Sequence, residues 1–270
     1  MNLGKHQIQQ YHELGYVAGP RVLDDEQIER LRKRIADIVE GRIPFPEKLK
    51  GKTVLKPGVS GHLPSVKIVN IFRNDEVFAE IYRNTHIGCL ANDLLEGPVR
   101  MWEDQMIYKP PYEDDAVVSW HRDYTYWDHV TPAEMGTCWI ALDDSVVANG
   151  CMHVIPGSHR WEYSYVRNDV DDDDPHWALR PEHVPEGADV TPVPCEVKAG
   201  HCHFHHCCVL HGSYGNRTGN PRRSYVMHLL PGNTRRIGDN WNERMASVDV
   251  PVGEIVRGPQ YPVLSHPSRV

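Results

Sequence analysis

Residues 199–213 read AGHCHFHHCCVLHGS, a run of strand-like character that leads to a histidine beside a glycine. Similar short runs rich in Val, Ile, Tyr and Trp recur along the chain, separated by Pro, Gly, Asn and Asp. The runs cover residues 98–109, 117–127, 136–143, 151–155, 193–198, 201–210 and 222–230. Many short strands punctuated by turn residues are typical of a β-sandwich or jelly roll, so we expect a mainly β fold.

The chain before residue 98 has a different pattern. Asp24 and Asp25 precede apolar residues at helical spacing and Gly41 follows them, which predicts a helix between these points. A second helical stretch is expected over about 75–96, whereas the Pro- and Gly-rich residues 42–66 are expected to form a loop. We therefore expect a single domain with a helical N-terminal part over about 1–97, a β core over about 98–232 and a C-terminal extension over 233–270.

The composition argues against several classes of protein. The 270-residue chain has a formal net charge of −8 and dispersed Lys and Arg, so nucleic acid is not an expected partner. No stretch approaches 18 apolar residues and the N-terminus has no apolar core, so we expect a cytoplasmic protein without membrane contact. The seven Cys form no Cys-x-x-Cys pair, which disfavours a disulfide framework or a thiolate zinc site. The chain has 17 His, six of them between His201 and His228, which points to metal chemistry.

A candidate pair of metal ligands lies in the sequence Trp120-His121-Arg122-Asp123. On a strand, His121 and Asp123 would project to the same face. An imidazole nitrogen beside a carboxylate oxygen offers two ligands to a divalent metal. Chance alone would place about one His-x-Asp in a chain of this composition, so the pair carries little weight by itself.

His211 is a candidate third ligand, because it follows a strand far away in the sequence and a barrel can bring distant strands face to face. His121, Asp123 and His211 would then form a triad of two histidines and one carboxylate. Such a triad binds Fe(II) and leaves coordination positions open for a co-substrate and O2.

Arg222 and Ser224 distinguish between possible uses of that triad. They open the strand 222–230 and share one face by alternation, and an arginine with a hydroxyl is suited to gripping a carboxylate. If 2-oxoglutarate binds the iron through its keto-acid end, its far carboxylate needs such a partner. The charges of Fe(II), Asp123, 2-oxoglutarate and Arg222 then cancel, as a buried site requires.

An ordered set of motifs runs through nearly the whole chain. The motifs are Tyr11-x-x-x-Gly15-Tyr16, His121-x-Asp123, Trp139-Ile140-Ala141-Leu142-Asp143-Asp144, Asn149-Gly150-Cys151, Ile155-Pro156-Gly157-Ser158-His159, and His211-Gly212-Ser213 followed by Asn216 and Arg222. In this order they resemble the phytanoyl-CoA dioxygenase (PhyH-like) family of Fe(II)/2-oxoglutarate-dependent oxygenases. One departure is Arg122, which stands where the family usually has Gln.

The resemblance implies a double-stranded β-helix (jelly roll) core with flanking helices, and an oxygenase that uses Fe(II), 2-oxoglutarate and O2. The implied reaction is hydroxylation of an unactivated C–H bond of a small-molecule metabolite, with release of succinate and CO2. Asp123 favours hydroxylation over halogenation, because a halogenating relative gives up this carboxylate to let a halide bind. Trp139 and Ser213 match family positions that contact 2-oxoglutarate, and Gln105 and Lys67 match less closely. Neither the substrate nor the oligomeric state follows from the resemblance, because the family's substrates diverge.

Two other functions remain open at this stage. A zinc-dependent hydrolase could use the same three ligands, but it would work without O2 and would not need Arg222. A non-catalytic cupin-like metal-binding module is the second alternative, although only half of a cupin motif follows Gly150.

Several residues near the predicted site have a simpler structural interpretation. His201, His203 and His205 alternate on one strand face, where we expect them to be hydrogen-bonded or exposed rather than metal ligands. His206 would face the opposite way. Arg223 would point away from Arg222, so we expect it to form a structural ion pair.

Overall fold

The computed structural model describes residues 2–43, 53–56, 65–162, 174–239 and 248–264. The helices are α1 (Lys5–Leu14), α2 (Asp25–Val39), α3 (Glu76–Tyr82) and α4 (Thr85–Leu94), with 3-10 turns η2 (Ile71–Arg73), η3 (Asp123–Tyr126), η4 (Val147–Asn149), η5 (Ser158–Arg160), η6 (Trp177–Leu179) and η7 (Pro181–His183). The strands are β1 (Tyr16–Arg21), β2 (Thr53–Lys56), β3 (Ser65–Val69), β4 (Val99–Lys109), β5 (Val118–His121), β6 (Val130–Thr131), β7 (Gly136–Ala141), β8 (Met152–Val154), β9 (Val193–Cys195), β10 (His201–His206), β11 (His211–Ser213), β12 (Arg222–Pro231) and β13 (Arg235–Arg236).

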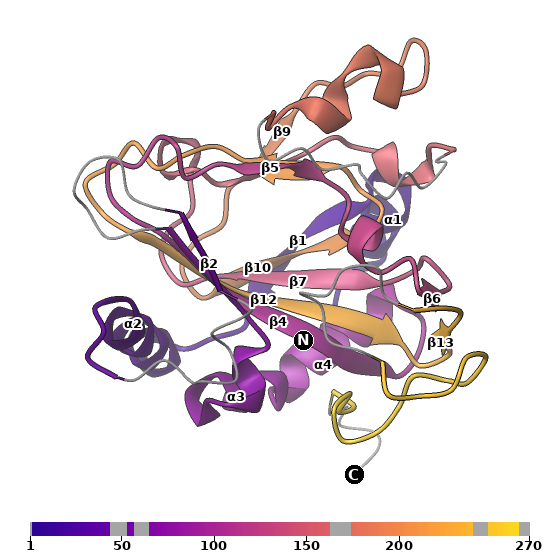
Figure 1. Ribbon diagram of the computed structural model, residues 1–270, viewed down its shortest axis with the longest axis horizontal. Helices are drawn as coiled ribbons and strands as arrows, with labels where there is room; N and C mark the ends of the chain where they lie inside the picture. The colour runs from indigo at the N-terminus through magenta and orange to yellow at the C-terminus, as the bar shows by residue number, and fades with distance from the viewer. Residues whose placement is uncertain (1, 44–52, 57–64, 163–173, 240–247, 265–270) are drawn as a thin grey trace.

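Two antiparallel sheets face each other, and the helices α2, α3 and α4 cover the outer side of the larger one (Figure 1). The large sheet has the strand order β1-β10-β7-β12-β4-β3-β2, and the small sheet has the order β5-β11-β8-β9. Several neighbours in these sheets are far apart in sequence, and N-terminal β1 pairs with β10. The fold is mainly β with flanking helices, as the sequence predicts.

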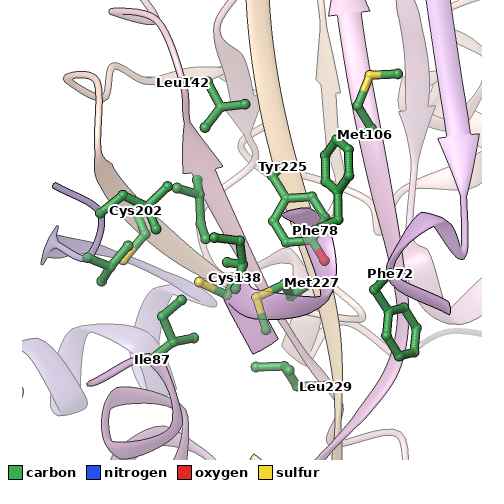
Figure 2. Close-up of a cluster of buried hydrophobic side chains, with 14 of the residues drawn as sticks. Phe72, Phe78, Ile87, Met106, Cys138, Leu142, Cys202, Tyr225, Met227 and Leu229 are labelled. Carbon is green, nitrogen blue, oxygen red and sulfur yellow. The ribbon is translucent and has the colours of Figure 1, made fainter. Parts of the chain in front are cut away.

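The apolar core lies between the outer face of the large sheet and the helices. Side chains of β4, β7, β10 and β12 meet residues of α3, α4 and η2 there, as Figure 2 shows. Phe78 of α3 packs on Tyr225 of β12 with ring centroids 5.4 Å apart. Fully burying one such large apolar side chain contributes roughly 1.5–3 kcal/mol, so this layer fixes the sheet on which the inner-face residues stand.

The inner face of the large sheet, which points toward the small sheet, is unusually polar. The register places His205, Thr137, His228 and Glu103 in one row across β10, β7, β12 and β4. The next row contains His203, Trp139, Val226 and Gln105. These side chains alternate with the apolar residues of the outer face, because successive residues of a strand point to opposite sides.

The helix expected between Asp24 and Gly41 is confirmed as α2. Asp24 accepts a hydrogen bond from the backbone N–H of Gln27, and α2 buries Ile28, Leu31, Ile35 and Ile38. The helical stretch expected over 75–96 is two helices, α3 and α4. Asn84 separates them, because its side chain caps α4 by accepting from the backbone N–H of His86 and Ile87.

Two predictions of local structure are wrong. The region expected to be a loop, 42–66, contains β2 and the start of β3; β3 pairs with β4 and β2 pairs with β3, so both extend the large sheet. The strand expected over 117–127 ends at His121, and Asp123 begins the turn η3. The division into helical part, core and extension stays a prediction. Within the described residues, no helix is both long enough and apolar enough to cross a membrane.

Candidate active site

The structure brings His121, Asp123 and His211 together, although they come from two strands and a turn. His211 is paired with His121 across β11 and β5, and their ring centroids are 4.2 Å apart. Asp123 Oδ1 lies 3.7 Å from His121 Nε2 and 3.6 Å from His211 Nε2. All three side chains are buried, and their donor atoms lie within 4.8 Å of one another. This spacing fits a single divalent ion.

The two histidines present the same ring atom to this point. His121 Nδ1 lies 2.7 Å from the carbonyl oxygen of Ser119, and His211 Nδ1 lies 3.0 Å from that of Val209. A carbonyl only accepts, so each Nδ1 donates its hydrogen and each Nε2 keeps its lone pair for a metal. Burial lowers the pKa of His211 well below its ordinary value, which favours the neutral imidazole that a metal requires.

Asp123 is fixed by its second oxygen. Oδ2 accepts a hydrogen bond from Thr137 Oγ1 at 2.8 Å and lies 3.2 Å from His205 Nε2. Thr137 Oγ1 also lies 2.8 Å from His228 Nδ1. Because the single hydroxyl hydrogen of Thr137 goes to Asp123, His228 must donate from Nδ1 to the threonine oxygen. Oδ2 is therefore engaged by the inner face, and Oδ1 is the oxygen left for a metal.

Residues 207–210 connect β10 to His211 and also hold the segment around Asp123. The guanidinium of Arg122 donates from Nε to the carbonyl of Cys208 at 3.0 Å. The backbone N–H of Tyr124 donates to the carbonyl of Cys207 at 3.0 Å. Asp123 thus reaches the site from a turn rather than by strand alternation, because both of its neighbours are tied to one loop.

Arg222 and Ser224 lie together on β12, as their spacing predicts. Arg222 donates from Nη1 to Ser224 Oγ at 3.1 Å and from Nη2 to the carbonyl of Gly150 at 2.9 Å, and its Cζ lies 5.5 Å from the ring centroid of Trp139. The side chain is only 2% exposed, yet its Nε has no hydrogen-bond partner among the described residues. A buried guanidinium with an unused donor fits a site for a carboxylate.

Ser213 lies beside a buried lysine, Lys109, that belongs to none of the sequence motifs. Lys109 donates from Nζ to Ser213 Oγ at 2.8 Å and also to the carbonyl of Tyr214. Lys109 is paired with Arg222 across β4 and β12, so two cations stand next to each other at this end of the inner face. Strand alternation could have indicated that Lys109 faces the site, since it is an even number of residues from Gln105 on the same strand.

Gln105 and Lys67 lie on β4 and β3 and are both partly buried. Gln105 is in the row of Trp139, and Lys67 is paired with Ile107. Arg223 points the other way and forms an ion pair with Asp143, from Nη2 to Oδ1 at 2.7 Å, so its predicted structural role is confirmed.

The histidine cluster agrees with the expectation only in part. His205 is hydrogen-bonded, since its Nε2 lies 3.2 Å from Asp123 Oδ2, whereas His203 is 2% exposed and is neither hydrogen-bonded nor on the surface among the described residues. Both ring nitrogens of His203 and Nε2 of His228 have no hydrogen-bond partner within the described part of the chain. Burial lowers the pKa of both His203 and His228 to about 3. Neutral imidazoles therefore line the inner face beside the three converging side chains.

Comparisons with known proteins agree with this arrangement. The family model for phytanoyl-CoA dioxygenase (PhyH) matches residues 11–224. The chain belongs to the PhyH family. It is therefore an Fe(II)/2-oxoglutarate-dependent oxygenase, and the three converging side chains fit the iron that PhyH enzymes use.

Individual relatives are more distant. The chain is 25% identical over 233 residues to a probable phytanoyl-CoA dioxygenase of Caenorhabditis elegans, covering 81% of this chain and 72% of the relative. It is 31% identical over 152 residues to L-proline trans-4-hydroxylase of Streptomyces griseoviridis, covering 55% of this chain and 52% of the relative. Among solved structures, EctD from S. alaskensis with 2-oxoglutarate and 5-hydroxyectoine matches with a TM-score of 0.71 and 20% identity, over 96% of this chain and 89% of EctD. This last likeness supports the jelly-roll fold.

Proposed function

We propose that the protein hydroxylates an unactivated C–H bond of a small-molecule metabolite, with Fe(II) held by His121, Asp123 and His211. The observation that carries the proposal is the convergence of two Nε2 lone pairs and Asp123 Oδ1 at one buried point. When bound, iron and 2-oxoglutarate supply the oxidising chemistry, and succinate and CO2 are released. The ring Nδ1 contacts and the Oδ2 contacts of Asp123 hold the three donors in place before any metal arrives.

The same proposal assigns the far carboxylate of 2-oxoglutarate to Arg222 and Ser224. The free Nε of Arg222 and the burial of both side chains support this role. Trp139 would form a wall beside the co-substrate, because the Arg222 guanidinium lies over its ring. The proposal also includes Ser213 of β11, Gln105 of β4 and Lys67 of β3 as further contacts of 2-oxoglutarate.

Hydroxylation is favoured by the carboxylate ligand. Asp123 occupies a position that a halogenating enzyme would leave open for a halide. The relationship to L-proline trans-4-hydroxylase also supports hydroxylation, because its matched segment is the most identical of the relatives described above.

The test is an anaerobic titration with Fe(II) and then 2-oxoglutarate, recording the visible charge-transfer band of the chelate. We expect one equivalent of each to produce the band, and we expect succinate release once O2 and a substrate are added. Zinc(II) in place of Fe(II) serves as the control and should give no band. Hydrolysis with Zn(II) in the absence of O2, without a band from Fe(II) and 2-oxoglutarate, would contradict the proposal.

A further inference from the structure

A buried carboxylate on the inner face has no role in holding iron or 2-oxoglutarate. Glu103 of β4 is 3% exposed, and its Oε1 has no hydrogen-bond partner among the described residues. It stands opposite His228 in the pairing of β4 with β12. The Nε2 atom of His228 is also buried and also without a partner in the described chain.

Both of these free atoms accept hydrogen bonds. His228 donates from Nδ1 to Thr137, so its Nε2 carries a lone pair and no hydrogen. In its ionised form, Glu103 likewise presents Oε1 as an acceptor. Leaving two buried acceptors unpaired costs about 1–3 kcal/mol for each one, so a bound group that donates hydrogen bonds would be stabilised at this place.

The neighbours of this pair place it beside the reacting centre. The rings of Trp127 and His228 lie in a T-shaped arrangement with their centroids 4.7 Å apart. His228 Nδ1 lies 3.7 Å from Asp123 Oδ2, which places the pair directly beside the proposed iron ligand. A group bound to Glu103 and His228 would therefore belong to a molecule that reaches the reacting centre.

We infer that Glu103 and His228 form a subsite for a protonated amine of the substrate, so that the substrate class is amine-bearing metabolites. This inference rests on the proposed function, because it places the subsite next to the iron. The ammonium would donate to Oε1 of Glu103 and Nε2 of His228 and lie against Trp127.

The electrostatics of Glu103 are consistent with an absent cation. Burial raises the pKa of Glu103 to about 8, with Asp123 and Asp104 adding to the rise, because the opposing effects of Lys67 and of the Trp127 indole N–H are too small to offset it. A bound ammonium would favour the charged carboxylate and bring this pKa down.

The test compares two small probes of the same ring size, pyrrolidine, which is protonated at pH 7, and the neutral alcohol cyclopentanol. Each is titrated anaerobically into the protein saturated with Fe(II) and 2-oxoglutarate, and the change of the charge-transfer band reports binding near the metal. We expect pyrrolidine to perturb the band of the wild type at a concentration at least about 10-fold lower than cyclopentanol, as a charged hydrogen bond predicts. In Glu103→Gln the difference between the probes should shrink to less than about 2-fold.

Asp104→Asn is the matched control, because Asp104 is the next residue of β4 but points to the outer face and accepts from Tyr225. It should keep the wild-type preference for pyrrolidine. Equal binding of the two probes by the wild type, no perturbation by either, or an unchanged preference in Glu103→Gln would each overturn the inference. Failure of the proposed function is distinguishable, because the band would then be missing before any probe is added.

Discussion

The two faces of the large sheet are built from the same strands but have opposite chemistry. On β12, Tyr225, Met227 and Leu229 point outward into an apolar layer against the helices. Arg222, Ser224 and His228 point inward and are just as buried. The outer face is mainly apolar, whereas the inner face includes polar atoms, Arg222 Nε and His228 Nε2, that have no hydrogen-bond partner among the described residues.

This difference suggests that the outer face of the sheet contributes mainly to stability and the inner face mainly to binding and catalysis. Outer-face changes should act on the free energy of unfolding, because these side chains pack against the helices and contact none of the residues proposed to bind iron or 2-oxoglutarate. Inner-face changes should act on iron, co-substrate or substrate. Variants placed on neighbouring residues of one strand can therefore test the assignment of each face.

The largest effect is expected for Asp123→Ala. Removing the carboxylate deletes one of three donors and frees Thr137 and His205, so turnover should fall to background, at least about 10³-fold, which corresponds to about 4 kcal/mol. The measurement is succinate release coupled to substrate oxidation. The outer-face control is Met227→Leu, a volume-conserving change that should cost less than about 1.5 kcal/mol of stability and keep turnover. Full product formation by Asp123→Ala would refute its assignment.

The next comparison uses two adjacent arginines. Arg222→Ala removes the proposed partner of the 2-oxoglutarate carboxylate, and the KM for 2-oxoglutarate should rise about 100-fold, as losing a buried charged pair predicts. Arg223→Ala removes only the ion pair with Asp143 and should leave that KM within about 2-fold, with a stability loss of about 1 kcal/mol or less. Steady-state kinetics with varied 2-oxoglutarate measures both. A similar KM for the two variants would show that β12 does not carry the co-substrate site.

A smaller effect is expected at Thr137, which contacts Asp123 but would not touch iron. Thr137→Val keeps the shape but leaves Oδ2 with one donor fewer, so the affinity for Fe(II) should fall about 10- to 100-fold. Thr137→Ser should restore most of it, because the hydroxyl returns. Fe(II) titration under anaerobic conditions gives the dissociation constants. If Thr137→Ser bound Fe(II) as weakly as Thr137→Val, the loss of affinity would come from the changed side-chain shape and not from the lost hydrogen bond.

The sequence predicted the fold class, the three converging side chains and the Arg222–Ser224 pair, because each depends on motif order or on strand alternation. It mislocated Asp123, since the end of β5 is set by the contacts of Arg122 and Tyr124 with residues 207–208. Strand β2 was missed because Pro- and Gly-rich residues surround this short segment, which pairs with the next strand, β3.

The inner-face network was not predictable from single residues. Thr137, His205 and His228 lie on three strands that are separated by long stretches of chain, and alternation gives their side but not what they meet. Glu103 was missed for the same reason. A buried polar residue and a core residue look alike in a strand pattern until the facing sheet is known.

The smallest effect separates the two adjacent acids of β4, Glu103 on the inner face and Asp104 on the outer face. Burial raises the pKa of Asp104 to about 7, although Tyr225 and the backbone N–H of Phe72 donate to its Oδ2. The folded protein therefore binds more protons than the unfolded chain between about pH 4 and pH 7, and stability contributed by this group falls as the pH rises through that window. Asp104→Asn stays neutral and keeps an oxygen for both donors, so the pH dependence of its unfolding free energy should be less steep, by at most about 1.4 kcal/mol per pH unit. Denaturant unfolding at pH 5, 6, 7 and 8 compares the slopes of the two proteins. Parallel slopes would mean that Asp104 is ionised in the fold, and the outer face would then tolerate a charge that its packing argues against.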